Sequence, residues 1–289
     1  GLALLAKIAR EEELHIESWP TVACALAGLE PMCEDRAAYD TLCQEIIAAR
    51  QEESLPLVQW RLLPVEIDAR FREAGDDGHK PDFFEKPGLS AWTWHDQFGD
   101  CSYDVDEDGL IIHAANYHDL WLNNFAAPRL LRPVEGDFAV DTVCAAAYND
   151  RPPLGGLLLW QDREHYLRLT WNTLAPDGVN LLGCLGNVDG LYGIGRLPGA
   201  HRVHLRLERI GERVRALCSA DGIDWYSVGE VDFPAGGPVQ VGPLAIGMIH
   251  RYVHPGAWPD GSAIRFTSLR LLAAAKAGTA YPLNKENST

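Results

Sequence analysis

The sequence predicts a mainly β protein, an antiparallel two-sheet jelly-roll sandwich preceded by a short N-terminal α-helical segment. Segments of alternating or β-branched residues recur along the second part of the chain, at 138–144, 156–160, 166–171, 203–208, 214–218 and 264–271. Asp-Gly pairs typical of tight turns stand at 108–109, 177–178 and 221–222. Because no helical period separates these strands, we expect antiparallel sheets packed face to face.

A helical period marks the first part of the chain. Between Asp35 and Arg50, apolar residues recur every three or four positions, and Asp35 is placed to cap the helix. The apolar residues of this stripe are Tyr39, Leu42, Cys43, Ile46 and Ile47. An earlier helical segment contains Val22, Leu26 and Leu29 and ends before Pro31, and a third follows Pro64 with Val65, Ile67 and Phe71.

The change in periodicity predicts four parts. Residues 1–74 form a helical linker or docking region, and residues 75–88, rich in glycine and aspartate, form a linker. Residues 89–275 form the β-sandwich, and residues 276–289 form a flexible tail.

Composition excludes several classes of partner. The formal net charge of -16 disfavours binding to nucleic acid and to anionic membrane surfaces. No apolar run approaches the ~18 residues of a membrane span, and no signal peptide is recognised. The seven cysteines form no Cys-x-x-Cys pair. Reduced thiols then point to a cytoplasmic location.

Several short motifs occur in an order that resembles a known family. Asp119-Leu-Trp121 is followed by Gly136-Asp-Phe138, by Tyr166-Leu-Arg-Leu169 and by Ser219-Ala-Asp-Gly-Ile-Asp-Trp225. Over residues 89–272 this order resembles the concanavalin A-like lectin/glucanase superfamily, in a bacterial branch like the domain of unknown function 1349. It is similar, more loosely, to the C-terminal sandwich modules of some family 43 glycosidases. The resemblance implies a jelly roll with one concave sheet face and supplies no catalytic residues.

The residues favour a non-catalytic domain. Glucanases of this fold carry Glu-x-Asp-x-x-Glu on one strand, so that alternate carboxylates face the groove. The nearest counterpart here is Glu230-Val-Asp232, where Ala235 replaces the last glutamate and Pro234 interrupts the strand. A carboxylate pair brought together only by folding stays open.

No cofactor is expected, although one loop keeps calcium as a minor alternative. Asp104, Asp106 and Asp108 match the first half of an EF-hand loop, but Ala115 stands where the bidentate glutamate belongs. His250 and His254 have helical ligand spacing within a proline-containing loop, which favours hydrogen bonding over metal binding. Asp221 and Gly222 predict a tight structural turn closed by Trp225.

The aromatic and amide residues supply the candidate ligand site. Sugars stack their C–H faces on rings and bond their hydroxyl groups to amides and charged groups. The alternation places Trp171 in the core and Trp160 on the opposite side of its strand. The predicted ligand-binding residues are Trp94, Trp121, Asn123, Asn124, Tyr166, Arg168, His250 and Tyr252.

Three functions remain open. The first is a module that binds a carbohydrate or similar polyol on the concave sheet face. The second is a structural or protein-interaction domain of a larger protein, whose N-terminal helices dock on a protein partner or an upstream domain. The third is a glycoside hydrolase with an unrecognised carboxylate pair.

Overall fold

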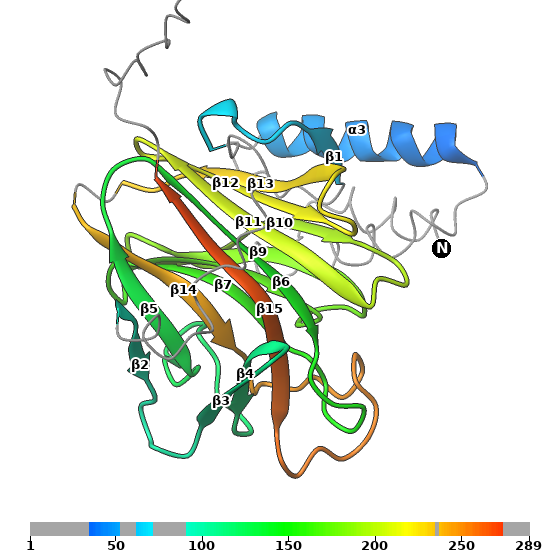
Figure 1. Cartoon of the computed structure of the whole chain (residues 1–289). Helices are drawn as coiled ribbons and strands as arrows, with labels where there is room; N and C mark the ends of the chain where they lie inside the picture. Colours follow the sequence, from blue (N-terminus) through cyan, green and yellow to red (C-terminus); the bar gives the residue numbers. More distant parts are fainter. Residues whose placement is uncertain (1–34, 53–61, 72–90, 235–236, 274–289) are drawn as a thin grey trace, which may run out of the picture.

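A computed structural model describes residues 35–52, 62–71, 91–234 and 237–273 of the chain. The predictions for the segment of Val22, Leu26 and Leu29 and for the tail after residue 276 lie outside these residues. The predicted fold class is confirmed, because two antiparallel sheets form a sandwich, and the described part of the N-terminal region contains an α-helix (Figure 1).

The larger sheet has eight strands and the smaller has seven. The order in the larger sheet is β1 (Leu63–Val65), β13 (Trp225–Asp232), β12 (Arg213–Ser219), β11 (Arg202–Ile210), β6 (Phe138–Ala146), β15 (Ser262–Ala273), β4 (Gly109–Ala114) and β3 (Ser102–Asp106). The order in the smaller sheet is β10 (Val188–Arg196), β9 (Gly178–Leu185), β8 (His165–Trp171), β7 (Gly155–Trp160), β14 (Val239–Ala245), β5 (Arg129–Val134) and β2 (Thr93–His95). Every pairing between neighbouring strands is antiparallel, as hairpin and Greek-key connections require.

The main core lies between the two sheets. Leu157, Leu159 and Leu167 of the smaller sheet pack against Phe138 and Leu205 of the larger one. Trp171 belongs to this core and is 2% exposed, so its predicted place is confirmed. The alternation of each strand therefore decides which of its side chains enter the core.

A second apolar cluster covers the outer face of the smaller sheet. Leu158 and Tyr166 point to this side, and Leu120 from the loop between β4 and β5 packs against them. Trp160 packs on the same cluster, so the prediction that it faces away from the core is confirmed. The loop of residues 115–128, called the cover loop below, therefore buries the middle of this face.

Helix α3 (Arg36–Glu52) agrees with the predicted helix and its cap. The backbone N–H of Ala38 donates to Oδ1 of Asp35 over 3.0 Å, which satisfies one free donor of the first turn. Tyr39, Leu42 and Cys43 of the predicted stripe are buried.

The predicted helix after Pro64 is wrong. Residues 63–65 form strand β1, which pairs with β13, and residues 69–71 form a 3₁₀ turn, η3 (Ala69–Phe71). The apolar spacing of Val65, Ile67 and Phe71 also fits a short strand followed by a turn. Residues 63–65 form a strand and not a helix because they pair with β13 at the edge of the larger sheet. The local period of the sequence does not reveal that this edge is available.

Candidate functional site

The candidate site begins with the cover loop, which is fixed at both ends by backbone hydrogen bonds. Tyr117 N–H donates to the Gly247 carbonyl over 3.0 Å, and Gly247 N–H donates to the His118 carbonyl over 2.7 Å. Further along, Ala127 N–H donates to the Asp119 carbonyl over 2.9 Å. These bonds connect the loop to the segment that follows β14 and close the loop on itself.

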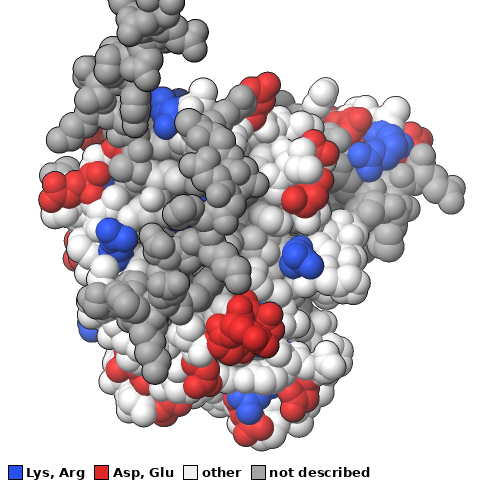
Figure 2. Space-filling view, in the orientation of Figure 1, with Lys and Arg blue, Asp and Glu red and all other residues white. Residues whose placement is uncertain are grey.

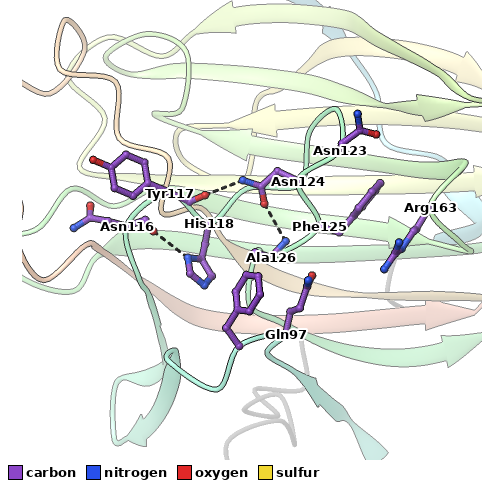
Figure 3. Close-up of a pocket in the computed structure, with 10 residues that line it drawn as sticks. Gln97, Asn116, Tyr117, His118, Asn123, Asn124, Phe125, Ala126 and Arg163 are labelled. Carbon is purple, nitrogen blue, oxygen red and sulfur yellow. Dashed lines mark hydrogen bonds between the residues drawn. The ribbon is translucent and has the colours of Figure 1, made fainter.

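Two side chains hold the loop in its fold. Asn124 Nδ2 donates to the Tyr117 carbonyl over 2.8 Å, while its Oδ1 accepts from Ala126 N–H over 3.1 Å (Figure 3). Beneath the loop, Nη1 of Arg168 donates to Oδ1 of Asp119, and both side chains are largely buried. A buried, hydrogen-bonded ion pair fixes orientation, because separating its members would leave a charge unpaired.

A groove runs beside the cover loop. It consists of two adjoining hollows of about 450 and 420 Å³ that share Gln97, Phe125 and Arg163, and we call both together the groove. The first is lined by Gln97, Phe98, Asn116, Tyr117, His118, Asn123, Asn124, Phe125, Ala126 and Arg163 (Figure 3). The second is lined by Trp94, His95, Asp96, Gln97, Phe125, Arg129, Trp160 and Arg163. Each volume lies in the ~300–1,000 Å³ range of small-molecule sites.

Aromatic rings form one wall of the groove. The ring of Phe125 meets those of Trp160 and Tyr166 edge to face, at centroid distances of 6.5 and 6.3 Å. Trp160 and Tyr166 stack on each other at 5.7 Å. Tyr166 is fully buried and donates to Oδ1 of Asp189 over 3.2 Å, so it holds the rings that line the groove from below.

Two guanidinium groups stand over these rings. Arg129 lies 4.8 Å above the Trp160 ring, and Arg163, at the tip of the β7–β8 hairpin, lies 5.0 Å above Phe125. Burial, and then the nearby charge of Arg163, lower the pKa of Arg129 to about 10, which still leaves it protonated at neutral pH. Burial, followed by the charge of Arg129, lowers the pKa of His95, which favours its neutral form.

Within the part of the chain that the structure describes, neither arginine has a carboxylate partner. Nη1 of Arg129 donates to the backbone carbonyls of Phe125 and Ala127, over 3.2 and 3.0 Å, and its Nε has no partner. Arg163 is exposed, and its guanidinium group contacts the ring of Phe125. In a chain of net charge -16, two arginines of this kind in one groove form a local positive site.

The predicted ligand-binding residues occupy four different settings. Trp94 and Asn123 line the groove, and Asn124 lines it while holding the cover loop. Trp121 is half-buried with its ring 5.8 Å from the Arg168 guanidinium. Tyr166 and Arg168 face the predicted side of the sheet but lie buried beneath the loop. The rings of His250 and Tyr252 lie 5.3 Å apart in a tilted arrangement, and neither residue lines either hollow.

Sequence reasoning missed Gln97, Phe125, Arg129 and Arg163 as groove residues. Arg129 is the one of these four that lies on a strand, so strand alternation could have indicated its side of the sheet. In the structure it pairs with His95 on the outer face of the smaller sheet. The other three come from connections, whose course over a sheet has no periodicity to show it.

The acidic loop at β3 and β4 is a strand hairpin and not the start of a helix–loop–helix motif. Asp106 forms an ion pair with Arg265, and Asp104 contacts Nε2 of His113 at 3.0 Å. Within the described ranges, Asp104, Asp106 and Asp108 do not converge on a common point. Figure 2 shows acidic side chains gathered over this hairpin.

Two other motifs have structural roles. Oδ1 of Asp221 accepts from the N–H groups of Ile223 and Asp224, over 2.8 and 2.9 Å, and Trp225 Nε1 donates to the Gly222 carbonyl over 3.1 Å. These hydrogen bonds lower the pKa of Asp221, and the predicted tight turn is confirmed. His254 Nε2 lies 2.8 Å from the Asn172 carbonyl, as expected for a hydrogen-bonding histidine.

Among the described residues, no helix has the length and apolarity to cross a bilayer. Their cysteines, Cys43, Cys101, Cys144, Cys184 and Cys218, are free thiols.

Comparisons with known proteins agree with this architecture. A functionally unknown protein from Saccharomyces cerevisiae is similar, with 18% sequence identity and a TM-score of 0.51, over 64% of this chain and 97% of that one. The GH43 BlXynB protein from Bacillus licheniformis is similar with 15% identity and a TM-score of 0.51, over 70% of this chain and 40% of that one. At such identities the likeness concerns the fold alone. No curated protein matches the chain.

The family comparison covers the central strands and the cover loop. The model of the family described as "Protein of unknown function (DUF1349)" matches residues 99–247, from the loop before β3 to the second residue after β14. This range holds the cover loop, the β7–β8 hairpin and most of both sheets. The chain therefore belongs to the DUF1349 family.

Proposed function

We propose that this chain is a non-catalytic binding module whose groove holds a carbohydrate that carries a negative charge, such as an oligosaccharide containing a uronic acid. The observation that carries the proposal is the pairing of each groove arginine with an aromatic ring, Arg129 with Trp160 and Arg163 with Phe125. The guanidinium groups suit a carboxylate, and the parts of the rings that they leave uncovered suit the C–H groups of a sugar.

The remaining polar groups of the groove support a polyhydroxylated ligand. Gln97, Asn123 and Asn116 line it with amide groups, each of which both donates and accepts hydrogen bonds. The amide of Asn116 already donates to the Trp258 carbonyl over 2.8 Å, and Asn123 is exposed. Gln97 and Asn123 are therefore the better partners for sugar hydroxyl groups.

The carboxylates of the groove support a binding role over hydrolysis. Among the residues that the structure describes, Asp96 is the one acidic residue that lines either hollow. Its carboxylate accepts the backbone N–H groups of Gly99 and Cys101, over 3.0 and 2.9 Å, which holds the loop it belongs to. Glycoside hydrolysis uses two carboxylates that flank the scissile bond, and the described groove does not supply the second.

The test is a binding screen of the full chain against matched acidic and neutral oligosaccharides, followed by titration of the best ligand. Arg163→Gln is expected to weaken binding of the acidic ligand about 10- to 100-fold, since a charge-assisted hydrogen bond contributes ~1.5–3 kcal/mol. The affinity of the unchanged chain is expected to fall as salt is added.

A matched control comes from an arginine–aromatic pair outside the groove. Arg151 lies 5.6 Å from the Tyr148 ring, and Arg151→Gln is expected to leave binding unchanged. Trp160→Ala should weaken binding of both acidic and neutral ligands, because the ring contacts the sugar whatever its charge. Equal binding by the unchanged chain and by both groove variants would refute the proposal.

A further inference from the structure

We propose that Asp100, Cys101 and His118 form a binding site for a zinc-class divalent cation at the edge of the groove. The three residues bring one carboxylate oxygen, one sulfur and one imidazole nitrogen within 4.8 Å of one another. They come from two connections, one before β3 and one after β4, so only the fold brings them together.

A hydrogen bond to a backbone carbonyl fixes which ring nitrogen of His118 carries the proton. Nδ1 of His118 lies 3.1 Å from the Asn116 carbonyl oxygen, which can only accept a hydrogen bond (Figure 3). Nδ1 must therefore carry the proton, and in the neutral ring Nε2 presents its lone pair. A ring N–H fixed on a backbone carbonyl is the usual support of a metal-binding histidine.

The other ring nitrogen of His118, Nε2, is buried beside a carboxylate. His118 is 6% exposed, and Nε2 is buried and forms no hydrogen bond, although Oδ1 of Asp100 lies 2.9 Å away. A lone pair next to a carboxylate oxygen is repulsive unless a cation stands between them. If Nε2 carried a proton, it would be expected to donate that proton in a hydrogen bond to Asp100. The structure contains no such hydrogen bond. A metal ion bound by both atoms satisfies them together.

The sulfur of Cys101 completes the donor set. It lies 3.7 Å from Oδ1 of Asp100, and it accepts a hydrogen bond from Ala115 N–H over 3.4 Å. Zinc bonds of ~2.0–2.3 Å in a tetrahedron place neighbouring ligand atoms roughly 3.3–3.8 Å apart, so small shifts suffice to close the site. A cation that binds to the sulfur displaces the thiol proton.

The charge and softness of the donors select the cation. A thiolate, a carboxylate and a neutral imidazole balance the charge of a divalent ion, which avoids leaving net charge in a partly buried place. Thiolate and imidazole favour zinc over magnesium or calcium. Three protein ligands leave a fourth position for water, on an ion held by a residue that lines the first hollow of the groove.

One neighbouring residue shields the site. The ring of Phe98 packs edge to face on His118 at a centroid distance of 5.5 Å, although 64% of Phe98 is exposed. Such a ring limits the access of water to the imidazole on that side and leaves the groove side open. The proposal thereby gives a role to a large apolar side chain that is otherwise exposed at a loop tip.

The experiment is a metal titration of the full chain after removal of bound metal with a chelator. Zinc affinity is measured by competition with a chromophoric chelator, and cobalt(II) is added separately to detect a sulfur-to-cobalt charge-transfer absorption. The unchanged chain is expected to bind one zinc ion that Cys101→Ser, His118→Gln and Asp100→Asn each weaken at least ~100-fold, since loss of outer-shell partners already costs ~10–100-fold. The cobalt–sulfur absorption should be absent from Cys101→Ser.

His165→Gln is the matched control, because Nδ1 of His165 contacts Oδ1 of Asp162 at 3.0 Å without a cysteine. It is expected to leave zinc affinity unchanged. The folding of every variant is checked by circular dichroism without metal, and Asp100→Asn, whose side chain is 50% exposed, keeps the test valid if another variant unfolds. Absence of zinc binding, or equal binding by Asp100→Asn and the unchanged chain, would overturn the proposal. Since no sugar is used, the outcome is independent of the proposed function.

Discussion

The buried Arg206 lies at the centre of a charge network on the outer face of the larger sheet that also includes Asp141, Glu208, Arg215 and Arg270. Arg206 is 1% exposed, and it donates to Asp141 over 2.9 Å and to Glu208 over 2.8 Å. Arg270 bonds Asp141 from β15, and Arg215 lies 3.3 Å from Glu208. The pairing of β11 with β6 and β12 aligns these side chains on one face, so their charges balance only in this strand register.

Loss of the Arg206 side chain is expected to destabilise the fold strongly. Arg206→Ala would leave Asp141 and Glu208 buried with fewer cationic partners, and breaking a buried pair in this way costs ~3–5 kcal/mol. Urea unfolding followed by tryptophan fluorescence measures the free energy of unfolding. Arg202→Ala, an exposed arginine on the same strand, should change that energy by less than ~0.5 kcal/mol. Similar losses for the two variants would argue against the buried network.

The lowered pKa of Asp68 makes the stability of the fold depend on pH. Hydrogen bonds from Arg70 lower the pKa of Asp68 from 3.8 to about 2. Because the folded pKa is the lower one, this pair stabilises the fold above about pH 4, and the effect is lost as the pH falls toward 2. Asp68→Asn should therefore lower the melting temperature slightly at pH 7 and leave it unchanged at pH 2. Asp150→Asn, an exposed control, should track the unchanged chain at both values.

At the scale of elements, close backbone contact decides where the cover loop lies. A Cβ atom at Gly247 would stand 1.8 Å from the Ala115 carbonyl oxygen, so the segment after β14 meets the loop where only glycine fits. The hydrogen bonds between Tyr117, His118 and Gly247 depend on this contact. The loop carries Asn123, Asn124 and Phe125, which line the groove. The shape of the groove therefore depends on the close contact at Gly247.

Gly247→Ala is accordingly expected to displace the cover loop. The overlap should cost ~1–3 kcal/mol and should speed hydrogen exchange at the amides of Tyr117 and Ala127, whose bonds hold the loop. Hydrogen exchange detected by NMR measures both amides. At Gly237 an added Cβ meets nothing within 4 Å, and Gly237→Ala serves as the control. Unchanged protection of Tyr117 in Gly247→Ala would show that the loop does not depend on this contact.

Sequence reasoning places side chains correctly where a strand gives them a regular period. It fails where the position of a side chain depends on how a connecting loop packs. Alternation correctly places Trp171 in the core and Trp160 outside it, because strand geometry is local. Tyr166 and Arg168 also face the predicted side, yet the cover loop buries them, and no local signal fixes where that loop packs. The sequence does not predict the three ligands of the proposed metal site for the same reason, because they lie in two different loops.

At the scale of the whole molecule, residues 62–71, which lie before the predicted start of the sandwich, belong to it. β1 pairs with β13, and Leu62 packs against the main core. Phe71 is 2% exposed, and its carbonyl accepts from Nη2 of Arg206 over 3.3 Å. Strand β1, the turn η3 and the network around Arg206 therefore form one unit, although β1 and η3 lie within the range 1–74 that the sequence predicts to be helical.

Two truncations test where the sandwich begins. A chain that lacks residues 1–71 loses β1, the buried Phe71 ring, and the bond from Asp68 N–H to Glu208 Oε1. Removing a buried Phe side chain alone costs ~3–5 kcal/mol, so this chain should unfold at much lower urea than one that lacks residues 1–61. Equal midpoints for the two truncations would place the start of the folding unit after η3, near the predicted boundary at residue 89. A lower midpoint for the shorter chain would place it at or before Leu62, since Asp68 and Phe71 contact the charged residues of β11.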